Sequence, residues 1–152
     1  MVIGSRTRTL IQADGEAAVL IIRRLRCKRE ICNLIHHELP DILVPYKRHE
    51  AETIEQIIEP PAEQEEPSYP CEASTVYRIK MWFSLLRQYL ESTIQALKVL
   101  YRADAALYEQ LCSLKPMSAE YRRETAGWLK RIVRMVVNCG RWPHTRLAYA
   151  DR

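Results

Sequence analysis

Four prolines fall within the twelve residues 59–70 and exclude a continuous helix there. The surrounding residues 50–75 carry eight Asp or Glu and no Lys or Arg, whereas residues 1–49 carry nine basic against five acidic residues and residues 76–152 fourteen against six. A Pro- and Glu-rich composition is typical of a solvated linker. An alternative is an acidic segment that covers a basic surface until nucleic acid displaces it.

This pattern divides the chain into three predicted parts. Residues 1–49 form a ribbon-like β-hairpin module, residues 50–75 form a short helix followed by the acidic linker, and residues 76–152 form a helical bundle with a basic face. The predicted fold class is α+β, mainly α. Hydrophobic residues make up 47% of the chain, which is ordinary for a globular protein and is enough to bury a core.

We predict no membrane partner and a cytoplasmic location. The longest apolar run, Ala17–Ile22, has six residues, whereas a membrane span needs about 20. The first residues do not show the cationic start, apolar segment and small-residue cleavage site of a secretory leader.

The residue pattern of the N-terminal part predicts strands. Residues 7–12 alternate between the two faces of a strand, residues 13–16 have turn chemistry, and residues 17–25 are apolar and β-branched. A β-hairpin follows from this pattern. Pro40 and Pro45 keep the stretch after it extended or turned.

Apolar residues at intervals of three and four positions predict helices in the rest of the chain. They cover residues 50–58, a range from a cap at Ser74 or Thr75 to Tyr101, residues 104–114, and residues 118–139. Gly140 is expected to end the last helix.

Five cysteines at irregular spacings argue against a disulfide framework. Cys27 and Cys32 follow the predicted hairpin and precede His36 and His37, as knuckle cysteines follow a hairpin in a zinc ribbon. The spacing is C-x4-C instead of the usual C-x2-C, and a structural zinc takes four ligands. Zinc at Cys27 and Cys32 therefore stands as the alternative to ordinary thiols, and the main prediction is a protein without a cofactor.

Basic residues suggest contacts with phosphate groups. The predicted helix 118–139 carries a basic stripe, and the tail after it places Trp142 between arginines, a composition suited to phosphate contact with stacking. Residues 74–83 also look like the start of a recognition helix in transposase helix-turn-helix domains. The alternatives are a helix that packs Trp82 and Phe83 into the core, and Trp142 as a lid on the bundle. The candidate nucleic-acid-binding residues are Arg78, Lys80, Arg122, Arg123, Lys130, Arg131, Arg134, Arg141 and Arg146.

No signature of an enzyme is present in the sequence. A phosphate-cradling glycine-rich loop, G-x-S-x-G and H-E-x-x-H are all missing. His37-Glu38 is followed by Leu39-Pro40-Asp41, so the zinc-protease pattern lacks its last ligand and its helix is broken by proline. The predicted helices leave no room for the folded acidic core of a two-metal nuclease. We therefore predict no enzyme and no catalytic residues.

Three stretches together resemble a known family. They are Leu25–Arg29 (LRCKR), Ile35–Arg48 (IHHELPDILVPYKR) and Val137–Thr145 (VNCGRWPHT). The family is uncharacterised and bacterial, mostly from spore-forming Firmicutes, and its members carry a transposase-like zinc ribbon and travel with mobile elements. The chain looks like a shortened member, because it has no upstream cysteine pair and Glu30-Ile31 separates Cys32 from Cys27.

These observations predict a non-catalytic nucleic-acid-binding protein related to mobile-element proteins, with DNA as its partner. The alternative is a protein-interaction or structural helical module that packs against a partner or forms a homo-oligomer. A third interpretation is a decayed fragment without a present function.

Overall fold

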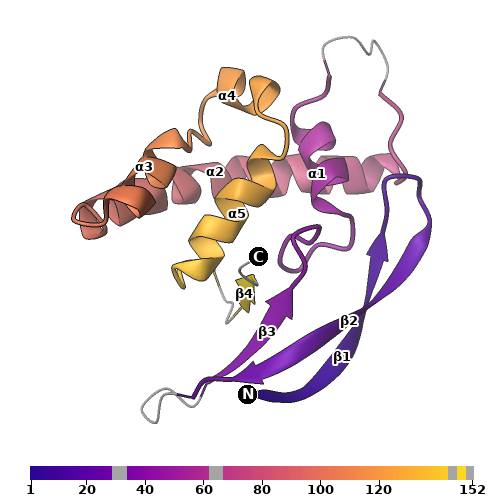
Figure 1. Cartoon of the computed structure of the whole chain (residues 1–152). Coiled ribbons are helices and arrows are strands. Elements are labelled where there is room, and N and C mark those ends of the chain that lie inside the picture. Colours follow the sequence, from indigo (N-terminus) through magenta and orange to yellow (C-terminus); the bar gives the residue numbers. More distant parts are fainter. Residues whose placement is uncertain (29–33, 62–66, 144–146, 150–152) are drawn as a thin grey trace.

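The computed structural model describes residues 1–28, 34–61, 67–143 and 147–149, and it is α+β, as predicted (Figure 1). Three N-terminal strands precede five helices, and a short strand follows them. The elements are β1 (Val2–Ile11), β2 (Ala17–Arg26), β3 (Ile35–Leu39), α1 (Ala51–Ile58), α2 (Ala73–Leu100), α3 (Ala105–Ser113), α4 (Ala119–Glu124), α5 (Trp128–Asn138) and β4 (Leu147–Tyr149).

The sheet has the order β1-β2-β3-β4. Strands β1 and β2 form the predicted hairpin, with Thr9 opposite Val19, and β3 adds antiparallel to β2 with His37 opposite Arg24. Gly15 adopts a φ of 88° in the hairpin turn, a conformation that favours glycine. Strand β4 pairs in parallel with β3, which brings the C-terminal segment beside the N-terminal sheet.

Most of the hairpin lies outside the core. Leu10 of β1 and Ile22 of β2 are fully buried, whereas Val19 and Ile21 of β2 are 66% and 71% exposed. The tip of the hairpin reaches the segment before α2, since a Cβ on Gly15 would lie 3.2 Å from the side chain of Pro70. Figure 1 shows the long hairpin on one side of the molecule, with its tip next to the start of α2.

The predicted helix 50–58 is confirmed as α1, and the long predicted helix is confirmed as α2. The predicted caps of α2, Ser74 and Thr75, are wrong: both residues lie inside the helix, and the N-cap is Glu72. The reason is that the carbonyl oxygen of Glu72 already accepts hydrogen bonds from the backbone N–H groups of Thr75 and Val76. The helix therefore begins one residue after Glu72, so that Ser74 and Thr75 lie in its first turn and not at the N-cap.

The predicted single helix over 118–139 is wrong, because the structure divides it into α4 and α5. Gly127 between them has a φ of 71°, a left-handed conformation that interrupts a helix. Gly140 ends α5 as predicted, with a φ of 66°. The backbone N–H of Arg141 donates to the carbonyl of Val136 and that of Gly140 to the carbonyl of Val137, which together form a Schellman motif.

Glu55 of α1 supplies the cap that α5 lacks from its own residues. Its carboxylate oxygens accept the backbone N–H groups of Gly127 at 2.8 Å and Leu129 at 3.0 Å. Burial raises the pKa of Glu55, although hydrogen bonds from the backbone N–H groups of Gly127, Trp128 and Leu129 oppose that shift. The contact fixes α1 against the start of α5 over a separation of more than 70 residues in sequence.

One hydrophobic core joins the three predicted parts of the chain. It contains residues of the hairpin such as Leu10, of α1 such as Ile54, and of α2 and α5. Phe83 of α2 packs edge-on against the fully buried Trp128 of α5, with ring centroids 5.3 Å apart. Within the residues that the structure describes, no helix has the length and apolar character that a membrane span requires.

Candidate nucleic-acid interface

The structure does not gather the predicted nucleic-acid-binding residues on one surface. Arg78 and Lys80 are exposed in the first turns of α2, whereas Lys130 and Arg131 are exposed on α5. Arg141 is exposed directly after α5. The predicted contact at Arg146 lies outside the described residues.

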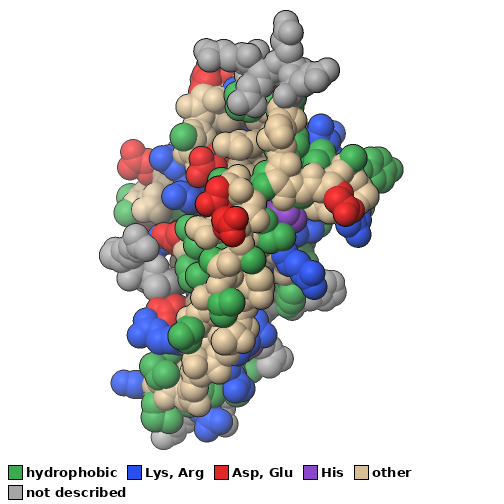
Figure 2. Space-filling model, turned by 90° about the vertical axis from the view of Figure 1, so that its right-hand side faces the viewer, with side chains coloured by type: hydrophobic (Ala, Val, Ile, Leu, Met, Phe, Trp, Pro, Cys, Tyr) green, Lys and Arg blue, Asp and Glu red, His purple; other side chains and the backbone are tan. Residues whose placement is uncertain are grey.

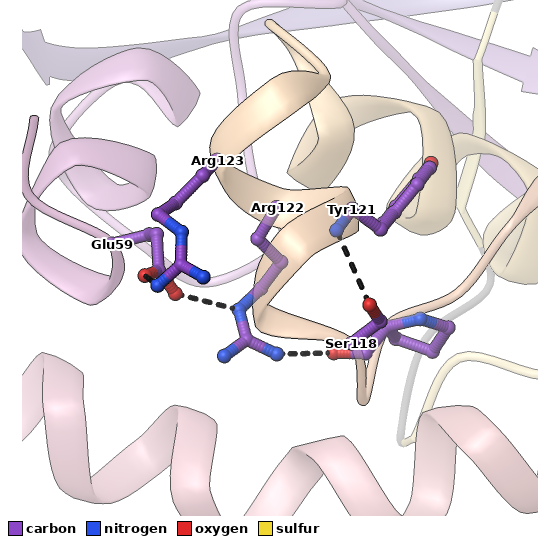
Figure 3. Close-up of polar contacts among 6 residues, drawn as sticks. Glu59, Ser118, Tyr121, Arg122 and Arg123 are labelled. Atoms are coloured by element: carbon purple, nitrogen blue, oxygen red, sulfur yellow. Dashed lines mark hydrogen bonds and ion pairs between the residues drawn. The ribbon is translucent and has the colours of Figure 1, made fainter.

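Two of the predicted residues are engaged with the end of α1. Arg122 of α4 donates to Glu59 at 3.1 Å and to the carbonyl of Pro116 at 2.7 Å, and Arg123 lies 3.6 Å from the same carboxylate. Figure 3 shows both guanidinium groups directed at Glu59. Only 10% of the Arg122 side chain is exposed, and its guanidinium also lies over the rings of Phe83 and Trp128. Arg122 therefore acts in this fold as a buried link between helices.

Arg134 of α5 is paired with Asp41, at 3.2 Å, in the loop after β3. Arg131 and Arg134 also line a cleft between α5, α3 and the end of α2, together with apolar residues such as Leu107 and Met135. Of the basic stripe that the sequence predicts on one helix, Arg134 is thus held in an ion pair, and it lines together with Arg131 a cleft that has both apolar and polar walls.

A more concentrated basic surface lies at the start of α2. Two adjoining clefts, of about 610 and 660 Å³, share Ile11, Tyr46, Lys47 and Arg48 in their walls. Of the described residues, five cationic residues and one acidic residue, Glu72, line them. We call this surface the basic cleft, and its cationic residues are Arg6, Arg8, Lys47, Arg48 and Arg78.

Three segments distant in sequence build the basic cleft. Strand β1 supplies Arg6 and Arg8, the loop after β3 supplies Lys47 and Arg48, and α2 supplies Arg78. Figure 2 views this side of the molecule and shows a histidine side chain near its middle, with lysine or arginine side chains just below it.

Hydrogen bonds hold the loop against the end of β1. The guanidinium of Arg8 donates to the carbonyls of Val44 and Lys47, at 3.1 and 2.5 Å. The backbone N–H of Ile11 donates to the carbonyl of Arg48, and the N–H of Glu50 donates to the carbonyl of Ile11. The side chain of Arg48 is thereby placed beside β1 by backbone pairing.

Tyr46 has an unusual backbone conformation at the junction of the two clefts. Residues 44–47 form a turn closed by a hydrogen bond from the N–H of Lys47 to the carbonyl of Val44, at 3.1 Å. Pro45 precedes Tyr46, which has a φ of 62°, so the turn is of type II, where glycine normally takes the third position. A non-glycine residue held in this region costs about 1–3 kcal/mol, and such residues cluster at functional sites.

Lys47 and His49 have surroundings that affect the charge of the basic cleft. The ammonium of Lys47 lies 4.0 Å from the centre of the Trp82 ring, and burial lowers the pKa of Lys47. His49 is only 8% exposed, and its Nε2 is buried without a hydrogen-bond partner among the residues that the structure describes. Burial lowers the pKa of His49, which favours the neutral imidazole.

Sequence reasoning missed most of the basic cleft. Of its five cationic residues, only Arg78 is a predicted contact. The other four lie on a strand and a loop, and no helical periodicity marks them. A signal was present in Tyr46-Lys47-Arg48, an aromatic next to two cations, and in the alternation of Arg6 and Arg8 on one face of β1.

The predicted zinc pair, Cys27 and Cys32, lies only partly within the described residues. Cys32, its predicted partner, lies outside the described residues. In the part of the chain that the structure does describe, no group of three or more His, Cys, Asp or Glu side chains could hold a metal ion. His36 and His37 are consecutive residues of β3, so their side chains point to opposite faces of the sheet. The described donors therefore do not fit a four-ligand zinc.

The fold and this surface define a small α+β protein with a basic cleft between a hairpin, a loop and a helix. Residues 1–79 match the family described as a domain of unknown function (DUF6431), and the chain belongs to that family. No curated protein and no solved structure matches the chain. All the cationic residues of the basic cleft lie within the matched residues, whereas α3, α4 and α5 lie beyond them.

Proposed function

We propose that this protein is a non-catalytic nucleic-acid-binding protein whose basic cleft contacts the phosphate backbone. One observation carries the proposal: among the residues that the structure describes, five cationic residues from three distant segments and a single acidic residue line two adjoining clefts. A groove lined by charge of one sign concentrates oppositely charged ligands, and arginine pairs well with phosphate. The total charge of +4 is small, so the concentration of charge in this cleft is what favours phosphate.

The resemblance of residues 25–29, 35–48 and 137–145 to mobile-element proteins gives this proposal its setting. Residues 35–48 of that resemblance include Lys47 and Arg48 of the basic cleft. We accordingly propose DNA associated with a mobile element as the partner, bound without strand cleavage or transfer.

Charge reversal at matched positions tests the proposal. Arg48→Glu with Arg78→Glu changes the net charge by the same amount as Lys130→Glu with Arg131→Glu, and all four residues are exposed. Fluorescence anisotropy would measure the affinity of each variant for labelled DNA. We expect the pair in the basic cleft to weaken binding by more than about tenfold and the α5 pair to weaken it much less. Equal losses would show that only net charge matters and would overturn the proposed location, and no binding by the unmodified protein would overturn the function.

A second candidate, a protein-interaction module, is favoured by the outer face of α2. Tyr77, Met81 and Leu85 are spaced by four residues, and they are 65%, 43% and 76% exposed. An exposed apolar stripe on a long helix is a common docking surface for a partner helix. Sedimentation would detect a homo-oligomer, and Leu85→Glu would dissociate it if this stripe forms the contact.

A further inference from the structure

The basic cleft contains an exposed aromatic ring at its centre, in addition to its charges. Tyr46 lines both of the adjoining clefts, and it is 70% exposed. Arg6 and Arg8 lie in the first cleft and Arg78 in the second, so cations flank the tyrosine on both sides. A strand whose phosphates followed these cations would cross Tyr46.

We propose that the basic cleft binds single-stranded nucleic acid and that a base stacks on the ring of Tyr46. This inference rests on the proposed function and adds the form of nucleic acid to it. Bases of a single strand have free faces that can stack on an aromatic side chain, whereas the bases of a duplex are already stacked on each other. A cationic groove with an aromatic platform is the arrangement that binds single strands with little sequence preference.

The turn at residues 44–47 supports a specific role for this ring. Glycine would adopt the φ of 62° without strain, yet the position holds a large aromatic side chain. Arg8 fixes the turn through its bonds to the carbonyls of Val44 and Lys47, so the position of Tyr46 is set before any ligand binds. Because the residue is mostly exposed, the backbone holds the ring of Tyr46 where a ligand could reach it.

Tyr46→Gly is the informative variant, because glycine suits the turn and removes only the ring. Tyr46→Phe keeps the ring and removes the hydroxyl. Tyr77→Ala is the matched control, because Tyr77 is 65% exposed on α2 and does not line either cleft. Thermal unfolding should show that Tyr46→Gly is folded and no less stable than the unmodified protein.

The probes are a labelled oligothymidylate of about 15 nucleotides and an abasic strand of the same length, which keeps the phosphates and lacks the bases. We expect Tyr46→Gly to weaken binding of the oligothymidylate by about fivefold to a hundredfold and to leave binding of the abasic strand unchanged. Tyr46→Phe and Tyr77→Ala should bind both strands as the unmodified protein does.

The other outcomes separate this inference from the proposed function. If Tyr46→Gly binds the oligothymidylate normally while Arg48→Glu with Arg78→Glu does not, stacking is wrong and phosphate binding stands. If the unmodified protein binds a duplex of the same length more tightly than it binds the single strand, the inference is wrong. If it binds neither strand nor duplex, the inference and the proposed function both fall.

Discussion

At the scale of single residues, the structure gives two neighbouring arginines different roles. Arg122 is almost buried against Glu59 and two aromatic rings, whereas 56% of the Arg123 side chain is exposed. From the sequence, both belong to one basic stripe. Charge pattern alone could not separate them, because the partner, Glu59, lies more than 60 residues away and meets them only after folding.

This difference predicts unequal effects on stability. Arg122→Ala should lower the free energy of unfolding by about 2–3 kcal/mol, because it leaves the mostly buried carboxylate of Glu59 with only the exposed Arg123 as a partner among the described residues. Arg123→Ala should lower it by less than about 1 kcal/mol, as is usual for an exposed ion pair. Urea unfolding of the two variants would measure both values, and equal effects would contradict the assignment of Arg122 as an internal link.

His49 makes stability depend on pH. Its pKa is lowered from 6.5 by burial, so the unfolded chain takes up the proton first as the pH falls. The contribution of the neutral imidazole is therefore fully present above about pH 6.5 and is lost as the pH falls toward the folded-state pKa. Burial lowers the pKa of His37 as well, which adds to the same trend.

Thermal unfolding across this range would test the role of His49. His49→Leu should lose stability less steeply than the unmodified protein between about pH 6.5 and 5, whatever its stability at neutral pH. An unchanged slope would show that other groups carry the pH dependence.

At the scale of elements, local sequence patterns predicted which helices and strands form better than they predicted where the helices begin and end. The hairpin, α1 and the end of α5 at Gly140 follow from alternation, helical periodicity and a C-terminal glycine. The break between α4 and α5 was missed because the apolar periodicity continues across it, whereas Gly127 changes the direction of the chain. The cap on α5 was missed for a similar reason, because Glu55 reaches it from another helix.

The cap from Glu55 predicts a coupling between α1 and α5. Glu55→Ala should lower the free energy of unfolding by about 1–3 kcal/mol, because it leaves the N–H groups of Gly127 and Leu129 without their acceptor. Glu52→Ala is the control on the same helix, and it should cost less than about 0.5 kcal/mol because Glu52 is exposed. Similar losses in the two variants would mean that the helix charge, and not the cap, is responsible.

At the scale of the whole molecule, the basic cleft depends on the fold more than on any segment of sequence. The α+β class could be predicted, because it is a sum of local patterns. The cleft could not, because β1, the loop after β3 and the start of α2 come together only when the hairpin tip reaches Pro70 and backbone bonds join residues 48–50 to Ile11. Arg78 was found since it lies in a recognisable helix, and Lys47 and Arg48 were missed since they lie in a loop.

The most direct test of the central claim is the salt dependence of binding. The logarithm of the association constant for a labelled single strand should fall linearly with the logarithm of salt concentration, and each lost phosphate contact reduces the slope by about 0.7. Replacing Arg48 and Arg78 together by glutamine should therefore reduce the slope by roughly 1 to 1.5. An unchanged slope in this variant, with binding retained, would contradict the account, because the phosphates would then be held somewhere other than in the basic cleft.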